Sequence, residues 1–164
     1  MGVFSMIVGV AGHQKRVGID WDWVSQAIST HLSVMPIQKA LSSLAEGTDQ
    51  VFADAAIDLG IAVVAIIPLD DYERFFSQAG LTKYRDLLQQ CTQVSLHWSG
   101  DPEHAFLNAG RYIVDSCDLL VAVWDGQPAD GLGGTADIVL YAKEQKRTIL
   151  HLNPCDQTVH FLQS

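Results

Sequence analysis

Short apolar stretches rich in valine and isoleucine alternate along this chain with segments whose apolar residues recur at helical spacing. The most apolar stretch, residues 61–69, has the sequence Ile-Ala-Val-Val-Ala-Ile-Ile-Pro-Leu. A strand that is apolar on both faces is typical of a parallel sheet covered by helices on both sides. The same reasoning predicts further strands at residues 5–10, 37–44, 93–98, 119–124 and 148–152.

Helices are predicted between these strands. One follows Asp20, because an aspartate side chain can cap a first turn, and one begins at Pro102, because proline suits that turn. A third follows residues 46–48 and stops at Gly60, and a fourth covers residues 136–145.

Residues 70–90 allow two interpretations. The segment holds one or two helices broken at Gly80, and it forms either a flap over a site or a pair of packed helices. The final ten residues show no clear pattern.

The alternation of strands and helices indicates the fold class. It predicts an α/β three-layer sandwich with a mainly parallel central sheet, right-handed crossovers and helices on both faces. A length of 164 residues, with 48% hydrophobic residues, suits a single domain over residues 1–164. No linker, repeat or low-complexity tract divides the chain.

Charge and composition narrow the expected partners. The formal net charge is −9, and an acidic surface repels phosphodiester backbones and anionic membranes, so we expect no nucleic-acid and no membrane partner. The three cysteines form no CxxC pair, which favours a reducing cytosol. The six histidines lack metal-ligand spacing, so we expect no metal site.

The first glycine-bearing loop follows the first predicted strand. In an open parallel sheet, ligands bind beyond the carboxyl ends of the strands, where strand order reverses. Gly12 allows close backbone approach to a ligand, His13 lies in the same loop, and Lys15 and Arg16 supply positive charge. The loop therefore predicts a cradle for phosphate or ribose phosphate, or else an ordinary turn with solvated basic residues.

The second loop contains Glu46, Gly47, Thr48 and Asp49. Gly47 supplies a tight turn and Thr48 a helix cap. The two carboxylates can bind ribose hydroxyls or serve as caps and surface charge, and for Asp49 we favour capping, because a carboxylate offsets the helix dipole.

The third loop is the most informative. Asp125 and Gly126 follow an apolar strand, and Gly133, Gly134 and Thr135 precede a helix. Exposed amides at the positive end of a helix make an anion site, so we predict that phosphate binds here.

Three segments resemble the SLOG superfamily, the Rossmann-like group related to the cytokinin-activating LOG proteins and to DprA. The segments are residues 8–13, residues 42–68, and residues 123–126 followed by 133–137. Together they span about residues 5–153. The resemblance implies a Rossmann-like fold, binding of nucleotides or their derivatives, and a homo-oligomer. It implies no cofactor other than a bound nucleotide.

The chain departs from the catalytic members of this group. LOG enzymes carry a glutamate three residues after the threonine of their glycine loop, and deoxyribosyltransferases carry an acid there. Here that position is Ile138, and the nearest acid is Asp137. A shift of one residue along a helix turns the side chain by about 100°, so Asp137 does not take the place of that acid.

We therefore favour a nucleotide-binding or sensing module without strong catalysis. The competing hypothesis is an N-glycoside hydrolase or transferase in which Asp125, Asp137 or Glu46 stabilises the sugar or acts as nucleophile. A structural subunit of a larger assembly is a third interpretation.

Overall fold

A seven-stranded sheet forms the centre of the protein in the computed structural model, which describes residues 5–14, 16–128, 132 and 134–163. Its strands lie in the order β4-β3-β2-β1-β5-β6-β7, and each adjacent pair is parallel except β6 and β7. The strands are β1 (Met6–Gly12), β2 (Ile37–Ser42), β3 (Ala62–Ile67), β4 (Thr92–Ser95), β5 (Leu119–Val123), β6 (Thr148–Asn153) and β7 (Thr158–Leu162).

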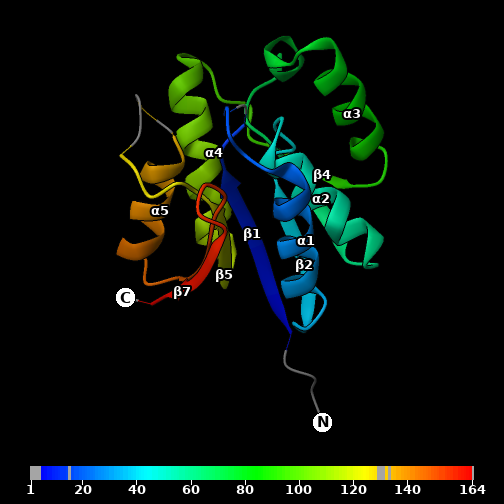
Figure 1. The fold of residues 1–164 in the computed structure, drawn as a ribbon. Helices are drawn as coiled ribbons and strands as arrows, with labels where there is room; N and C mark the ends of the chain where they lie inside the picture. The colour runs from blue at the N-terminus through cyan, green and yellow to red at the C-terminus, as the bar shows by residue number, and fades with distance from the viewer. Residues whose placement is uncertain (1–4, 15, 129–131, 133, 164) are drawn as a thin grey trace.

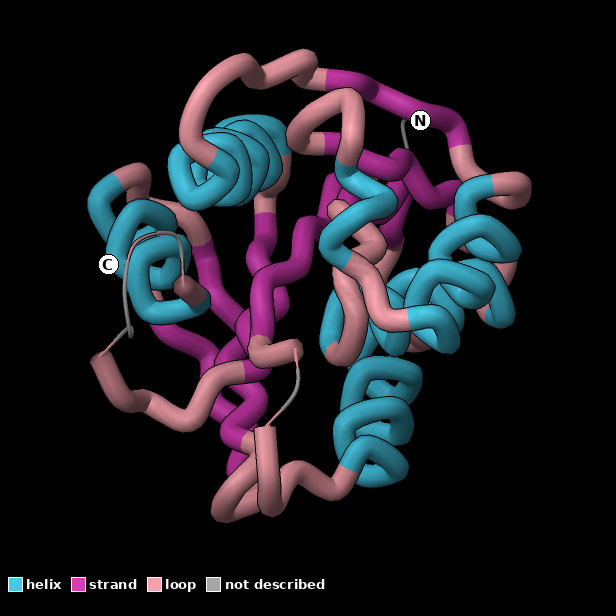
Figure 2. Tube along the Cα trace, turned by 90° about the horizontal axis from the view of Figure 1, so that it is seen from above, coloured by secondary structure: helices cyan, strands magenta, loops and turns pink. Residues whose placement is uncertain are grey.

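Two helical layers cover the sheet, so the predicted three-layer α/β architecture is confirmed. The helices are α1 (Trp21–Leu32), α2 (Thr48–Asp58), α3 (Gln78–Leu88), α4 (Pro102–Ser116) and α5 (Thr135–Glu144), with a short 3-10 helix η1 (Tyr72–Phe75). Helices α1 and α2 lie on one side of β1, and α4 and α5 lie on the other (Figure 1). Seen from above, the helices flank the strands on both sides (Figure 2).

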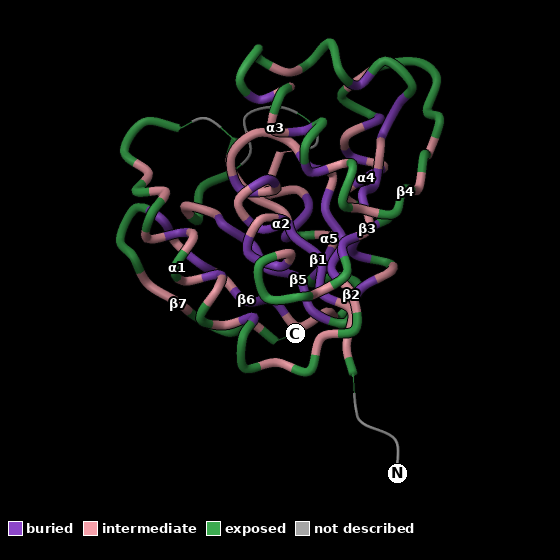
Figure 3. The backbone as a smooth tube through the Cα atoms, turned by 90° about the vertical axis from the view of Figure 1, so that its right-hand side faces the viewer, coloured by how far each residue is buried: buried purple, intermediate pink, exposed green. Residues whose placement is uncertain are grey.

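The core lies between these layers. One cluster joins Val8 of β1 to Ile28 of α1 and Phe52 of α2, and a second joins Ile113 of α4 to Leu120 of β5. Buried residues accordingly run along the strands and the inner faces of the helices (Figure 3). No described helix has the length and apolar character needed to cross a membrane.

The strand order reverses between β1 and β5. The chain passes outward from β1 to β4 and then crosses to β5, so that β1 pairs with both β2 and β5. Gly12 pairs in register with Val123. The loops that follow β1 and β5 therefore begin side by side, at the place where open α/β sheets bind ligands.

Two details differ from the sequence prediction. Helix α3 is not broken at Gly80, because this buried glycine lies within the helix; a Cβ there would come within 2.2 Å of the Glu46 carboxyl. The chain breaks before α3 instead, where Phe76 is extended and the Ser77 hydroxyl caps the Gly80 N–H at 3.1 Å. The final residues, without a clear pattern in sequence, form β7 by pairing antiparallel with β6.

Candidate functional site

An ion-paired cluster bridges the loops after β1 and β5. The Asp125 N–H donates to His13 Nε2 at 3.1 Å, and the Arg16 guanidinium donates to the Asp125 carboxylate. Arg16 Nη1 also lies 3.2 Å from His13 Nε2. The structure thus brings together three residues that the sequence assigned to two different loops.

The charges of this cluster follow from its burial and its contacts. Burial lowers the pKa of His13 below its usual value, the Asp125 carboxylate raises it, and Arg16 lowers it further. Burial also acts to raise the pKa of Asp125, but the Gln127 N–H and the nearby His13 and Arg16 outweigh it and lower the pKa. At neutral pH His13 is therefore neutral, and ionised Asp125 compensates Arg16.

The second loop packs directly on the first. Thr48 is fully buried, and both its hydroxyl and its N–H donate to the His13 carbonyl, at 2.8 and 3.1 Å. Gly47 has a φ of 83°, and a Cβ on it would lie 2.2 Å from the Gln14 carbonyl oxygen. A Cβ on Gly12 would come within 2.4 Å of Thr48. These residues hold the two loops in contact.

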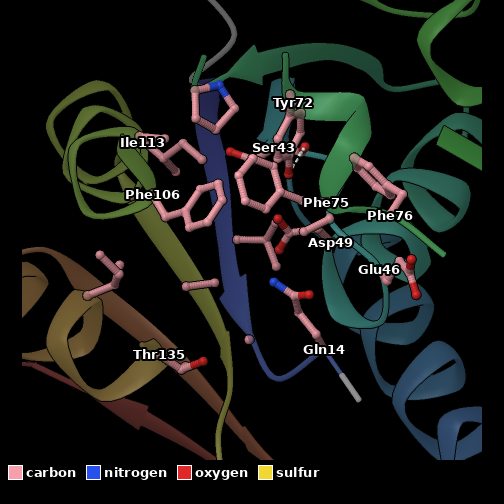
Figure 4. Close-up of a pocket in the computed structure, with 18 residues that line it drawn as sticks. Gln14, Ser43, Glu46, Asp49, Tyr72, Phe75, Phe76, Phe106, Ile113 and Thr135 are labelled. Atoms are coloured by element: carbon pink, nitrogen blue, oxygen red, sulfur yellow. Dashed lines mark hydrogen bonds between the residues drawn. The ribbon is translucent and has the colours of Figure 1, made fainter. Parts of the chain in front are cut away.

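A cavity of about 240 Å³ lies against these loops, between η1 and helices α2, α4 and α5 (Figure 4). Its apolar lining includes Val10, Pro68, Phe75, Phe76, Phe106, Ile113 and Ile138, and its polar lining includes Gln14, Ser43, Glu46, Asp49, Tyr72 and Thr135. Gly12 also borders it.

Aromatic side chains from η1, from the residue after it and from α4 form one wall of this cavity. Phe75 meets Phe106 edge to face at 5.1 Å between ring centroids, and Tyr72 meets Phe76 at 5.0 Å. The Tyr72 hydroxyl donates to the Ser43 carbonyl at 3.0 Å, which ties this wall to the loop after β2. Residues 70–90 thus form a 3-10 helix, η1, which contributes to the cavity wall, and one α-helix, α3, which packs beside α2.

Asp49 points into the cavity from the first turn of α2 (Figure 4). Asp49 does not cap this helix by a side-chain hydrogen bond, because the N-cap is Gly47, but it places a carboxylate in the first turn, where such a group offsets the helix dipole. Burial raises the pKa of Asp49 to about 7. A hydrogen bond with the Ala45 backbone acts in the opposite direction, but its effect is smaller. Burial and the charge of Asp49 in turn raise the pKa of Tyr72. Sequence reasoning gave no indication of this coupled pair.

The other predicted carboxylates lie differently. Glu46 lines the cavity, and its Oε1 accepts the Ser77 N–H at 2.5 Å, at the start of α3. Asp137 lies in the first turn of α5 but is not among the described residues that line the cavity, whereas Ile138 is. Asp125 is engaged with His13 and Arg16.

The third loop is only partly described. Gly134 is the N-cap residue of α5, without a side-chain cap, and Thr135 lines the cavity. Gly126 is exposed with a φ of 83°. Lys15 and Gly133 lie outside the described residues. Among the described residues no group of three or more His, Cys, Asp or Glu side chains is placed to hold a metal ion.

No protein-family model matches the chain, and no curated protein matches it in sequence. Among solved structures, DprA from Streptococcus pneumoniae superposes with a TM-score of 0.65 at 18% identity, over 89% of this chain and 50% of its own. DprA from Helicobacter pylori gives 0.66 at 14% identity, over 90% and 65%. The molybdenum cofactor binding protein of Rippkaea orientalis gives 0.57 at 16% identity, over 93% and 78%.

The chain shares the Rossmann-like α/β fold of these proteins. It spans half to about two thirds of the DprA proteins it resembles. The shared fold overturns one expectation, the exclusion of nucleic acid, because DprA from Helicobacter pylori has this fold and a single-stranded DNA binding mode. Net charge sums the whole surface, whereas binding depends on the groups at one site, so a charge of −9 does not exclude a nucleic-acid partner.

Proposed function

We propose that this chain binds a nucleotide or a nucleotide-derived phosphate ligand, as a binding or sensing module. The observation that carries the proposal is the position of the cavity. It lies beyond the carboxyl ends of β1, β2 and β3, beside the strand-order reversal between β1 and β5, and extends to the first turn of α5. Ligands of open α/β sheets bind at such reversals, and phosphates bind at helix N-termini.

The start of α5 supports the phosphate end of this ligand. The N-cap, Gly134, offers no side-chain acceptor to the first-turn amides, and Thr135 places a hydroxyl on the cavity. The first amides of a helix lack partners within it and carry about half a positive charge. The Asp137 N–H already donates to the Gly134 carbonyl at 3.1 Å, so a phosphate at Thr135 would meet the amides of Thr135 and Ala136. Arg16 is paired with Asp125, so this proposal does not depend on it.

The aromatic wall supports the nucleoside end. Phe75 is exposed and Phe106 is half-buried, and both line the cavity, so these two rings keep surface for a flat ligand ring; Phe76 packs on Tyr84 at 4.7 Å between ring centroids. Stacking of a base on an aromatic side chain contributes about 1–3 kcal/mol. A volume of about 240 Å³ is below the common range of about 300–1,000 Å³ for small-molecule sites, which favours a mononucleotide over a dinucleotide.

Binding is better supported than cleavage of a glycosidic bond. The position three residues after Thr135 faces the cavity, and it carries the buried apolar side chain of Ile138. The carboxylate of Glu46 is held by the Ser77 N–H, and that of Asp125 is held by Arg16.

Calorimetry with AMP, ADP, ADP-ribose and pyrophosphate tests the proposal. Thr135→Asp keeps a residue suited to a helix N-terminus but repels an anion, so we expect at least tenfold weaker binding. Gln90→Glu adds the same charge at an exposed residue that lines no part of the cavity, and should bind like the parent protein. The proposal fails if none of these ligands binds at millimolar concentration, or if Thr135→Asp binds as well as the control.

A further inference from the structure

The charged side chains of the cavity around Asp49 are all of one sign. None of the described residues that line it is lysine or arginine, whereas two carboxylates, Asp49 and Glu46, line it. Two nearby cations, Arg16 and Lys83, line a neighbouring groove instead. Both cations form ion pairs: Arg16 is paired with Asp125, and Lys83 is paired with Asp54 at 2.7 Å.

The aromatic wall adds to this negative potential. The face of an aromatic ring carries partial negative charge and attracts cations, and such contacts are strongest where water is excluded. Phe75 already shows this property, because the Arg74 guanidinium lies 4.6 Å from its ring centroid. That arginine is itself paired with Asp71 at 2.9 Å and is not among the described residues lining the cavity.

Asp49 is the carboxylate that lies in the middle of the cavity (Figure 4). Each titratable group that lines the cavity has a hydrogen bond: Glu46 accepts the Ser77 N–H, the Tyr72 hydroxyl donates to the Ser43 carbonyl, and Asp49 accepts from the Ala45 backbone. Burial penalises the ionised form of Asp49, so its pKa stands at about 7. A proton or a cationic ligand can relieve that penalty.

We propose that this cavity selects a ligand bearing a positively charged ring or a quaternary nitrogen, with the Asp49 carboxylate as counter-ion and Phe75 and Phe106 as its aromatic walls. The inference deepens the proposed function, on which it rests: the phosphate lies at α5, and the cationic group of the same ligand lies between Asp49 and the aromatic wall.

A matched pair of ligands tests the charge. Oxidised and reduced nicotinamide mononucleotide have nearly the same shape, but only the oxidised ring is positive. At pH 8 we expect calorimetry to give at least tenfold tighter binding of the oxidised form. Asp49→Asn, which removes the charge at constant size, should abolish that preference. Asp54→Asn, which removes an ion-paired carboxylate of the neighbouring groove, should retain it.

A second variant tests the aromatic wall and leaves Asp49, in the first turn of α2, unchanged. Phe75→Leu changes an exposed ring and should weaken the oxidised ligand more than the reduced one. Equal affinities for the two forms in the parent protein, or a preference that survives Asp49→Asn in folded protein, would overturn the inference.

Two further ligands separate this inference from the proposed function. If AMP binds and the oxidised ring gives no advantage, the function stands and the inference is overturned. If 1-methylnicotinamide, a cation without phosphate, binds in an Asp49-dependent way while AMP and pyrophosphate do not, the cationic subsite stands and the phosphate function is overturned.

Discussion

The Asp125 N–H and His13 Nε2 lie 3.1 Å apart, across the gap between the carboxyl ends of β5 and β1. This bond uses the lone pair of Nε2, so it requires neutral imidazole with its proton on Nδ1. The arrangement makes His13 a reporter of the site, because its pKa depends on two neighbours of opposite charge.

Titration of His13 by NMR should show this dependence. In the parent protein we expect a pKa below the usual 6.5, since burial disfavours the imidazolium. Asp125→Asn should lower the pKa further, because it removes a negative charge that raises it. Arg16→Gln should raise the pKa, because it removes a positive charge that lowers it. Shifts in the same direction for both variants would contradict the assignment.

The contact between the first two loops makes a second prediction. Gly47 and Gly60 both have a positive φ, of 83° and 76°, but only Gly47 meets a neighbour, the Gln14 carbonyl. Gly60→Ala should cost roughly 1–2 kcal/mol of unfolding free energy from the backbone conformation alone. Gly47→Ala should cost about 1–3 kcal/mol more, because the loops must separate. Urea unfolding measures both, and equal costs would argue against a close contact.

Local patterns predicted the layers of this fold well, and the reason is visible in the strands. The apolar run at residues 61–69 indicated a buried parallel strand, and it forms β3. Asp20 and Pro102 marked helix starts, where Asp20 Oδ1 accepts the Trp23 N–H at 3.1 Å and Pro102 begins α4. These features depend on neighbours within a few residues, which the sequence displays directly.

The cavity wall depends on contacts that the sequence does not display. Phe75 and Phe106 are far apart in the chain and meet only because η1 folds back over α4. Asp49 follows Gly47 by two residues, so its direction depends on where the turn ends and the helix begins. Strand β7 needs its partner β6, since its exposed and half-buried positions do not alternate.

The hydrogen bond from Tyr72 to Ser43 gives a third prediction. Tyr72 is buried, so Tyr72→Phe keeps the ring but leaves the Ser43 carbonyl without this donor. We expect a loss of about 1–2 kcal/mol in unfolding free energy. Tyr112→Phe, at a half-exposed ring on α4, is the control and should change stability by less than about 0.5 kcal/mol. Thermal unfolding of the two variants compares them, and similar midpoints would show that the bond contributes little.

The raised pKa of Asp49 makes the stability of the protein depend on pH. Its folded pKa of about 7 lies above the unfolded value of 3.8, so the folded state retains a proton that the unfolded chain releases. This stabilisation is complete below pH 3.8 and is lost as the pH rises through about 7. The total is up to about 4 kcal/mol.

Asp49→Asn removes this titration while keeping the size of the side chain. The variant should therefore be more stable than the parent protein at pH 8, with the difference shrinking as the pH falls towards 5. Because His13 also titrates in this range, the difference between the two proteins is the quantity to follow, by urea unfolding at each pH. Asp54→Asn, which removes a nearly half-exposed carboxylate of the same helix, paired with Lys83, is the control for loss of a carboxylate outside the cavity. An Asp49→Asn difference that is constant from pH 5 to pH 8 would mean that Asp49 is ionised throughout, and that the cavity already compensates its charge.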